Sequence, residues 1–143
     1  MKRFRTAVGV AALLVGIGLS AAPAQAAAGT ASEVTTCYNS LFGGAFFCGG
    51  AYGTGPTYVM LDNGNVQEYV IGTDHAVWTY WSGPDSRGWM SLGGYLTSKV
   101  KVSNLQGTGG FCTISALGGD SRPWYRDGGR GVWSAWYTDR VSS

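Results

Sequence analysis

The hydrophobic pattern beyond about residue 34 is that of short β-strands separated by turns. Apolar and β-branched runs of four to six residues alternate with segments rich in Gly, Asn, Asp or Pro. No window longer than about ten residues keeps a 3.6-residue apolar period without an interrupting glycine. The pattern therefore predicts an all-β fold. The strands we expect in its first part lie at 34–38, 45–48, 58–61, 66–71, 77–81 and 89–92.

Two stretches of the chain resemble each other at a spacing of about 45 residues. Asp74–Trp78 reads D-H-A-V-W and Asp120–Trp124 reads D-S-R-P-W, at an offset of 46 residues. Further on, Trp89 aligns with Trp133 at an offset of 44. A repeat of this length with four strands is typical of a β-propeller blade. We therefore expect about two four-stranded antiparallel, propeller-like blades in residues 57–143.

Two blades are too few to close a propeller within one chain. Three interpretations follow from the sequence: the chain oligomerises to complete a propeller, its two sheets fold as a small β-sandwich, or it is a fragment of a longer propeller. The sequence leaves all three open.

The N-terminus has the features of a secretory signal peptide. Residues 6–19 carry no charge, and their length is below the about 20 residues that a membrane-spanning helix needs. Ala24-Gln25-Ala26 fits the small-x-small rule for signal peptidase. The basic residues that precede the apolar stretch are Lys2, Arg3 and Arg5. We expect cleavage after Ala26, and hence a secreted, extracellular protein.

Cleavage changes the charge of the protein. Without the three basic residues of the signal peptide, seven of the ten Lys and Arg remain against eight Asp and Glu, a net charge of about −1. A nearly neutral chain has no basic surface for nucleic acid or for an anionic membrane. No later segment is apolar enough to form a membrane helix. We therefore expect neither nucleic-acid binding nor membrane insertion.

The three cysteines predict one disulfide. Cys37 and Cys48 bracket Gly43-Gly44, which can turn a hairpin, so we expect them to pair within an N-terminal arm and hairpin at 27–56. Cys112 lies in an apolar run and is expected to be buried, with an intermolecular bridge as the alternative. One His and three scattered Cys do not form a zinc pattern. We expect no metal and no cofactor.

The run Val70–Gly94 resembles one blade of the tachylectin-like and fucose-binding bacterial β-propeller lectins. It holds a Gly-x-Asp turn at Gly72–Asp74, then an apolar residue and Trp78, then Gly88-Trp89 and a Leu-Gly-Gly stop at Leu92–Gly94. The resemblance covers residues 58–98 well. It is weaker over 100–138, which keep Asp120, Trp124 and Trp133 but lack the Leu-Gly-Gly stop, and residues 27–56 do not match. The resemblance implies a lectin with shallow ligand grooves between its blades.

Sugar binding needs flat apolar faces beside groups that hydrogen-bond hydroxyls. The chain supplies both. We expect Trp78 and Trp124 in the core, and Asp62, Asp74 and Asp120 as turn formers. The resemblance places Trp89 and Trp133 near the ligand groove. The complete set of candidate ligand-binding residues is Trp81, Asp85, Arg87, Trp89, Arg122, Trp133 and Trp136.

These features favour a secreted, non-catalytic, carbohydrate-binding protein over an enzyme. Neither a Gly-x-Ser-x-Gly elbow nor a His-Glu-x-x-His motif occurs. A small hydrolase built on Glu68 is the catalytic alternative. The main alternative is an adaptor or structural subunit of a secreted complex, docking a partner protein through its aromatic face. The expected partners are a glycan and either further copies of the chain or a secreted protein.

Overall fold

The computed structural model describes residues 32–107 and 110–138. The described residues form ten β-strands and one short 3-10 helix, so the all-β prediction is confirmed. The expected strand bounds agree with the structure within one residue. The predicted signal peptide lies outside the described residues. The elements are β1 (Thr35–Tyr38), β2 (Ala45–Cys48), η1 (Gly50–Tyr52), β3 (Thr57–Met60), β4 (Val66–Ile71), β5 (Val77–Trp81), β6 (Met90–Gly93), β7 (Lys101–Gln106), β8 (Phe111–Leu117), β9 (Pro123–Gly129) and β10 (Val132–Trp133).

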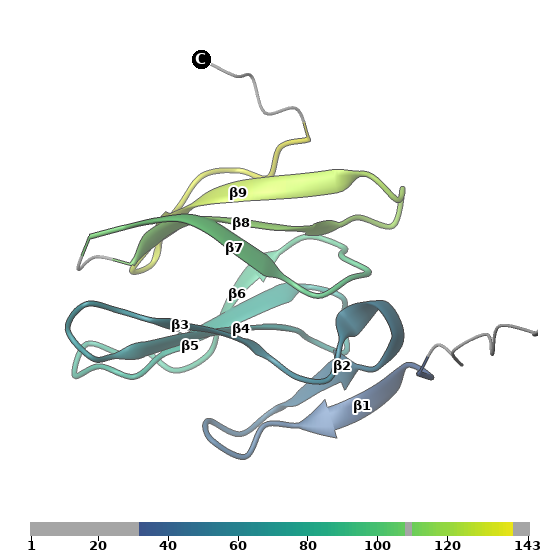
Figure 1. Cartoon of the computed structure of the whole chain (residues 1–143), viewed down its shortest axis with the longest axis horizontal. Helices are drawn as coiled ribbons and strands as arrows, with labels where there is room; N and C mark the ends of the chain where they lie inside the picture. Colours follow the sequence, from purple (N-terminus) through teal and green to yellow (C-terminus); the bar gives the residue numbers. More distant parts are fainter. Residues whose placement is uncertain (1–31, 108–109, 139–143) are drawn as a thin grey trace, which may run out of the picture.

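The strands form three antiparallel sheets. The N-terminal hairpin pairs β1 with β2, sheet 1 has the order β3-β4-β5-β6, and sheet 2 has the order β10-β9-β8-β7. The three layers follow one another in space in chain order, with sheet 1 between the hairpin and sheet 2 (Figure 1). The arrangement is sandwich-like. Among the described residues, no helix is long and apolar enough to cross a membrane.

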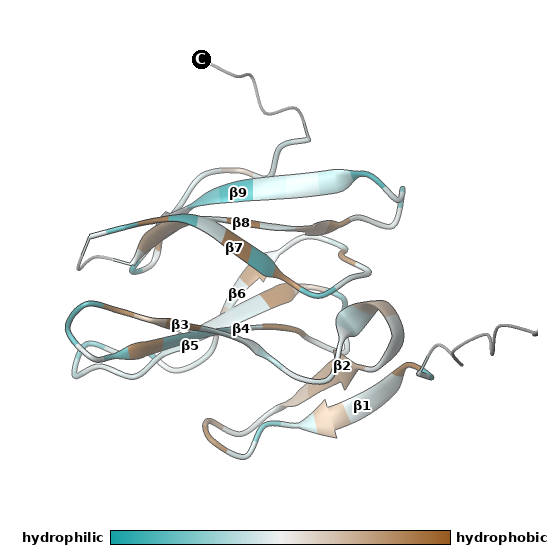
Figure 2. Cartoon of the chain, viewed as in Figure 1, coloured by the Kyte–Doolittle hydropathy of each residue, from teal (hydrophilic) through white to brown (hydrophobic). Residues whose placement is uncertain are grey.

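The main hydrophobic core lies between the two four-stranded sheets. Tyr69 and Ile71 of β4 pack in one buried cluster with Ile114 and Ala116 of β8. A second, smaller cluster joins Val70, on the opposite face of β4, to the hairpin. Because successive strand residues point to opposite faces, β4 contributes to both clusters. Hydrophobic segments on β6 and β8 contrast with the paler, more polar β9 at the outside of the stack (Figure 2).

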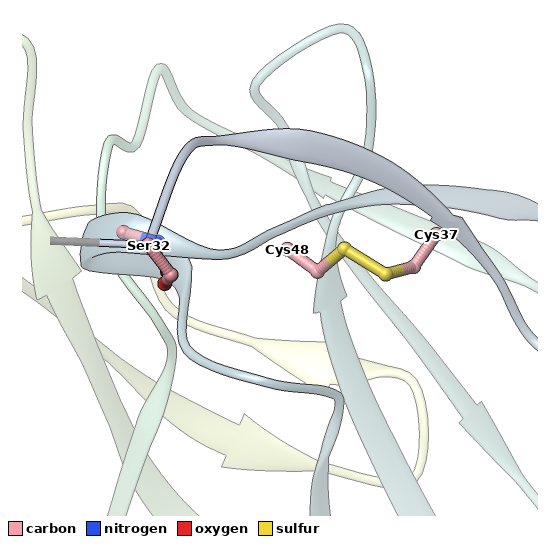
Figure 3. Close-up of a disulfide and its surroundings, with 4 residues drawn as sticks. Ser32, Cys37 and Cys48 are labelled. Atoms are coloured by element: carbon pink, nitrogen blue, oxygen red, sulfur yellow. Dashed lines mark hydrogen bonds between the residues drawn. A yellow bond between two sulfur atoms is a disulfide. The ribbon is translucent and has the colours of Figure 1, made fainter. Parts of the chain in front are cut away.

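The predicted disulfide between Cys37 and Cys48 is present and joins the two strands of the hairpin (Figure 3). Ser32, just before β1, accepts a hydrogen bond from the backbone N–H of Gly50 on its hydroxyl oxygen, at 2.9 Å. Cys112 is free and buried, 3.3 Å from the hydroxyl of Tyr69. A buried thiol has no path to another chain while the sheets stay packed.

The two sheets stack in the same direction. When Gly118 is aligned with Gly72, Ile114 is the equivalent of Glu68 and Ala116 is the equivalent of Val70. The face of sheet 1 that meets the hairpin is therefore the counterpart of the face of sheet 2 that meets sheet 1. By the same alignment Leu117 corresponds to Ile71. Ile71 is 3% exposed under sheet 2, whereas Leu117 is 42% exposed on the outer face of sheet 2.

The sequence alignment of Trp89 with Trp133 is wrong. Tyr125 of β9 forms an antiparallel bridge with Tyr137, as Thr79 of β5 does with Met90. Trp136, just before Tyr137, is therefore the counterpart of Trp89. The two residues of β10 intervene and pair with the end of β9, an insertion that sheet 1 lacks. Because of this insertion, Trp133 lies nearer in sequence than the true counterpart, Trp136.

Candidate functional site

Two hollows lie where successive layers meet. Site 1, between the hairpin and sheet 1, has a volume of about 300 Å³. Site 2, between the end of sheet 1 and sheet 2, has a volume of about 390 Å³. Both volumes lie at the lower end of the range for small-molecule pockets. Site 1 is lined by Gly44, Ala45, Phe46, Val70, Gly72, Thr73, Asp74, Trp78 and Trp89. Site 2 is lined by Gly94, Tyr95, Leu96, Gly119, Asp120, Trp124 and Trp136.

The two sites are built in the same way from the same positions of the repeat. Each has a wall made of a glycine, a variable residue and an apolar residue. The apolar residue bridges to the glycine that opens the Gly-x-Asp turn of the next layer. Phe46 pairs with Gly72 in site 1, and Leu96 pairs with Gly118 in site 2. The other matched sets are Asp74, Trp78 and Trp89 in site 1 and Asp120, Trp124 and Trp136 in site 2.

An Asp–Trp pair fixes one tryptophan in each site. Asp74 Oδ1 accepts hydrogen bonds from the backbone N–H of Ala76 at 3.0 Å and from the indole N–H of Trp78 at 3.1 Å. Asp120 Oδ1 accepts from the N–H of Arg122 and the indole of Trp124, both at 3.1 Å. The aspartates are turn formers, as predicted, and each also orients an indole.

Hydrogen bonding also tunes the carboxylate of site 2. The backbone N–H of Arg122, and after it the indole of Trp124, hold the pKa of Asp120 below its ordinary value. Both bonds stabilise the ionised form. Site 2 therefore presents a carboxylate that is charged at neutral pH.

Glycine is required where the Asp–Trp pair crosses the preceding strand end. A Cβ on Gly72 would lie 2.6 Å from Asp74 Oδ1 and 2.8 Å from Cδ1 of Trp78. A Cβ on Gly118 would lie 2.7 Å from Asp120 Oδ1 and 2.6 Å from the ring of Trp124. The Gly-x-Asp-x-x-x-Trp spacing is thus a packing requirement of the site.

The second tryptophan of each site is tied to the backbone of the wall. The indole N–H of Trp89 donates to the carbonyls of Gly43 at 3.0 Å and Phe42 at 3.3 Å. The indole N–H of Trp136 donates to the carbonyl of Leu92 at 2.9 Å. Both indoles are half-buried, so each site has two oriented aromatic rings and one carboxylate.

The sequence placed residues 27–56 outside the repeat, and the hairpin within this range supplies one wall of site 1. Gly43-Gly44 begins the wall of site 1 as Gly93-Gly94 begins the wall of site 2, and all four glycines have positive φ. The sequence does carry a signal, a Gly-Gly pair about 45 residues before a tryptophan. The match is short, and it lies in a hairpin whose other residues differ from the repeat.

The structure places the seven predicted ligand residues in three different environments. Trp89 and Trp136 line the two hollows. Trp81 is only 6% exposed, and Trp133 packs edge-on against Tyr69 at 6.2 Å at the margin of the core. The others lie on exposed turns and line neither hollow: Asp85, Arg87 and Arg122.

Four site residues were absent from the predicted set. Residue type alone predicts Asp74 and Asp120 as turn formers, and the strand pattern predicts Trp78 and Trp124 in the core. The structure leaves both tryptophans half-buried, because their strand face ends at the gap between layers. Their duplication at an offset of 46 residues was the available signal.

The two sites combine apolar ring faces with hydrogen-bond acceptors. A carboxylate has about four lone-pair positions, so each aspartate can accept further hydrogen bonds beside those it already makes. Within the ranges 32–107 and 110–138, no three metal-ligating side chains gather in one place. The arrangement suits a small ligand with both C–H faces and hydroxyl donors.

Fold and sites together define a class: an all-β, disulfide-containing protein of antiparallel sheets, with one site built twice at the layer junctions. The chain matches no known protein-family model, and no curated protein matches it.

Proposed function

We propose that this is a secreted, non-catalytic, carbohydrate-binding protein with two equivalent sites. The observation that carries the proposal is the Asp–Trp pair with its second tryptophan, repeated with the same hydrogen bonds in both hollows. The disulfide between Cys37 and Cys48 agrees with export to an oxidising compartment.

The chemistry of each site fits a monosaccharide unit. An indole face contacts the apolar C–H patch of a pyranose ring, and the aspartate accepts hydrogen bonds from hydroxyl groups. The sites differ at the variable wall position, Ala45 in site 1 and the exposed Tyr95 in site 2. We therefore expect the two sites to prefer different glycans, because Tyr95 gives site 2 a third aromatic ring.

Calorimetric titration with glycans chosen from an array tests the proposal. The wild type is expected to bind two equivalents. Trp78→Ala and Trp124→Ala should each weaken one of the two sites about tenfold, because the lost stacking platform is worth about 1.4 kcal/mol. The control is Val132→Ala, at a residue that is 70% exposed and outside both hollows. Two unchanged sites in both tryptophan variants would refute the assignment.

The same proposal includes assembly of several copies into a closed ring, as in a propeller. Its support is the uniform stacking direction, because the outer face of sheet 2 corresponds to the face of sheet 1 that sheet 2 covers. Contacts of this head-to-tail type close into rings when the rotation per unit allows it. Several weak sites on one ring would bind a glycan surface with avidity.

An adaptor function is the second candidate, favoured by apolar side chains on the hairpin. Tyr38 is 75% exposed and Val34 is 48% exposed. Exposed apolar patches mark protein interfaces. The double variant Val34→Ser/Tyr38→Ser would separate the candidates: loss of a secreted partner with both glycan sites retained supports the adaptor.

A further inference from the structure

Glu68 is a carboxylate buried at the junction between the hairpin and sheet 1. It is 0% exposed, and its Oε2 has no hydrogen-bond partner. Its counterpart in sheet 2 is Ile114, which is also 0% exposed. An apolar residue therefore satisfies the packing at this position of the repeat. Since burying a carboxylate is costly, the departure at Glu68 calls for a role other than packing.

Glu68 holds the loop that forms the wall of site 1. Its Oε1 accepts a hydrogen bond from the side-chain amide of Asn39, across 29 residues of sequence. Asn39 Oδ1 in turn accepts from the backbone N–H groups of Leu41 and Phe42, both at 2.9 Å. The backbone N–H of Asn39 donates to the carbonyl of Gly44 at 2.8 Å. We call residues 39–44 the wall loop.

The wall loop contacts the aromatic side of site 1 directly. Its carbonyl at Gly43 accepts the indole N–H of Trp89, and the ring of Phe42 stacks on Tyr80 with centroids 3.9 Å apart. Gly44 itself lines the hollow. A continuous set of contacts thus runs from Glu68 through Asn39 to the ligand-facing wall.

The wall of site 2 is held by different contacts. Its wall continues from β6, a strand of sheet 1. The carbonyl of Leu92 accepts from the indole of Trp136 at 2.9 Å and also from the guanidinium of Arg126. No carboxylate stands among these contacts. The two sites share their ligand-facing residues and differ in what holds their walls.

We propose that Glu68 is a positioning residue that couples the docking of the wall loop, and with it ligand affinity at site 1, to its own protonation, while site 2 stays uncoupled. The ligand part of this inference rests on the proposed carbohydrate-binding function. The docking part does not.

The direction of the coupling follows from burial. Desolvation raises the pKa of Glu68 from 4.5 to about 7, against a smaller opposite effect of the Asn39 hydrogen bond. Displacing the wall loop admits water, and the pKa then returns toward its ordinary value. The docked form therefore holds the proton more tightly. Docking weakens as pH rises from about 4.5 through about 7 and changes little above that.

The titratable side chains in register with Glu68 are two tyrosines. Its register partners are Tyr58 on β3 and Tyr80 on β5. Both side chains are phenols. Burial, and after it the charge of Glu68, raises the pKa of Tyr58 above its ordinary value. From the hairpin, the facing group is the neutral amide of Asn39.

The first experiment needs no ligand. Nuclear magnetic resonance measures hydrogen-exchange protection of the indole N–H groups, corrected for the intrinsic pH dependence of exchange, from pH 5.5 to 8. We expect protection of Trp89 to fall at least fivefold while that of Trp136 stays constant. Glu68→Gln keeps an acceptor for Asn39 and is neutral, so its Trp89 protection should be independent of pH. An identical pH profile in wild type and Glu68→Gln would overturn the coupling.

The second experiment measures affinity for a neutral glycan, with Trp124→Ala isolating site 1 and Trp78→Ala isolating site 2. Site 1 should bind at least fivefold more tightly at pH 5.5 than at pH 8, and Glu68→Gln should abolish that difference. Glu68→Ile introduces the residue type that sheet 2 carries at the equivalent position. This variant should fold but weaken site 1 at every pH, because Asn39 loses its acceptor.

A His75→Gln background provides the control for pH. His75 is the only histidine in the sequence, so its replacement removes every imidazole from the protein. It stacks on Tyr95 of site 2, with centroids 4.3 Å apart. A pH profile of site 1 that disappears in His75→Gln and persists in Glu68→Gln would refute the assignment. If neither site binds any glycan, the proposed function fails, while the protection of Trp89 still decides whether Glu68 controls the wall loop.

Discussion

Asp74 and Asp120 each serve two partners that lie two and four residues further along the chain. One is a backbone N–H that closes the turn, and the other is the indole that faces the hollow. The turn function follows from residue type and could be predicted. The indole contact depends on a positive φ at His75 and at Ser121, which bends the chain so that the tryptophan returns over the carboxylate.

The Asp120–Trp124 pair predicts a pH response of site 2. The pKa of Asp120 is lower in the folded protein than its ordinary value of 3.8. The pair therefore stabilises the fold fully at pH values above 3.8, and this stabilisation is lost as the pH falls through the pKa of the folded state. The indole N–H resonance of Trp124 should stay constant from pH 7 to about 4 and shift only below. Asp120→Ala should lower affinity at site 2 about tenfold and leave site 1 unchanged. A shift of the resonance above pH 5 would contradict the assignment.

At the scale of elements, the N-terminal hairpin takes the place in site 1 that the end of sheet 1 takes in site 2. It supplies the Gly-Gly wall but carries its own disulfide instead of two further strands. Only Phe46, Cys48 and Val70 form its buried cluster with sheet 1, a smaller contact than the core between the sheets. The disulfide joins β1 to β2 within the hairpin, and the Asn39–Glu68 hydrogen bond adds to the contacts that hold the hairpin on sheet 1.

Removing the disulfide tests the contribution of the hairpin. Cys37→Ala/Cys48→Ala opens a loop closed across 11 residues, and we expect the free energy of unfolding to fall by about 2–3 kcal/mol. Site 1 should weaken while site 2 keeps its affinity. Denaturant unfolding and calorimetry measure the two effects, and mild reduction of the wild type should reproduce the double variant because Cys112 takes no part in a bridge. Equal weakening of both sites would show that the hairpin stabilises the whole molecule.

At the scale of the whole molecule, identical stacking of successive layers leaves one face without its repeat partner. The outer face of sheet 2 carries a hollow of about 510 Å³ lined in part by Lys101, Leu117 and Tyr125. The matching face of sheet 1 is closed by sheet 2. A second copy offers a complementary layer to that face, which is the physical basis for the proposed ring.

Light scattering coupled to size exclusion tests the assembly. We expect the mature wild type to elute as a closed oligomer that resists reductant, and Leu117→Lys to elute as a monomer, because a charge then replaces an apolar side chain at the contact. Val132→Lys, at an exposed hairpin tip, should assemble like the wild type. A monomeric wild type would refute the ring and leave the two-site binding proposal standing.

The sequence by itself determined the all-β class, most strand bounds, the disulfide and the existence of a repeat. Those features depend on local alternation, on turn residues such as Gly64, and on cysteine spacing, all of which can be read along the chain. The tertiary structure decided which tryptophans face a hollow. Trp78 and Trp124 lie at layer junctions, whereas Trp81 is enclosed, and strand alternation cannot distinguish a junction from a core. It also decided that Trp136 is the counterpart of Trp89, and that Glu68 meets Asn39 across the hairpin. Such contacts join distant segments, and only the packing of the layers brings them together.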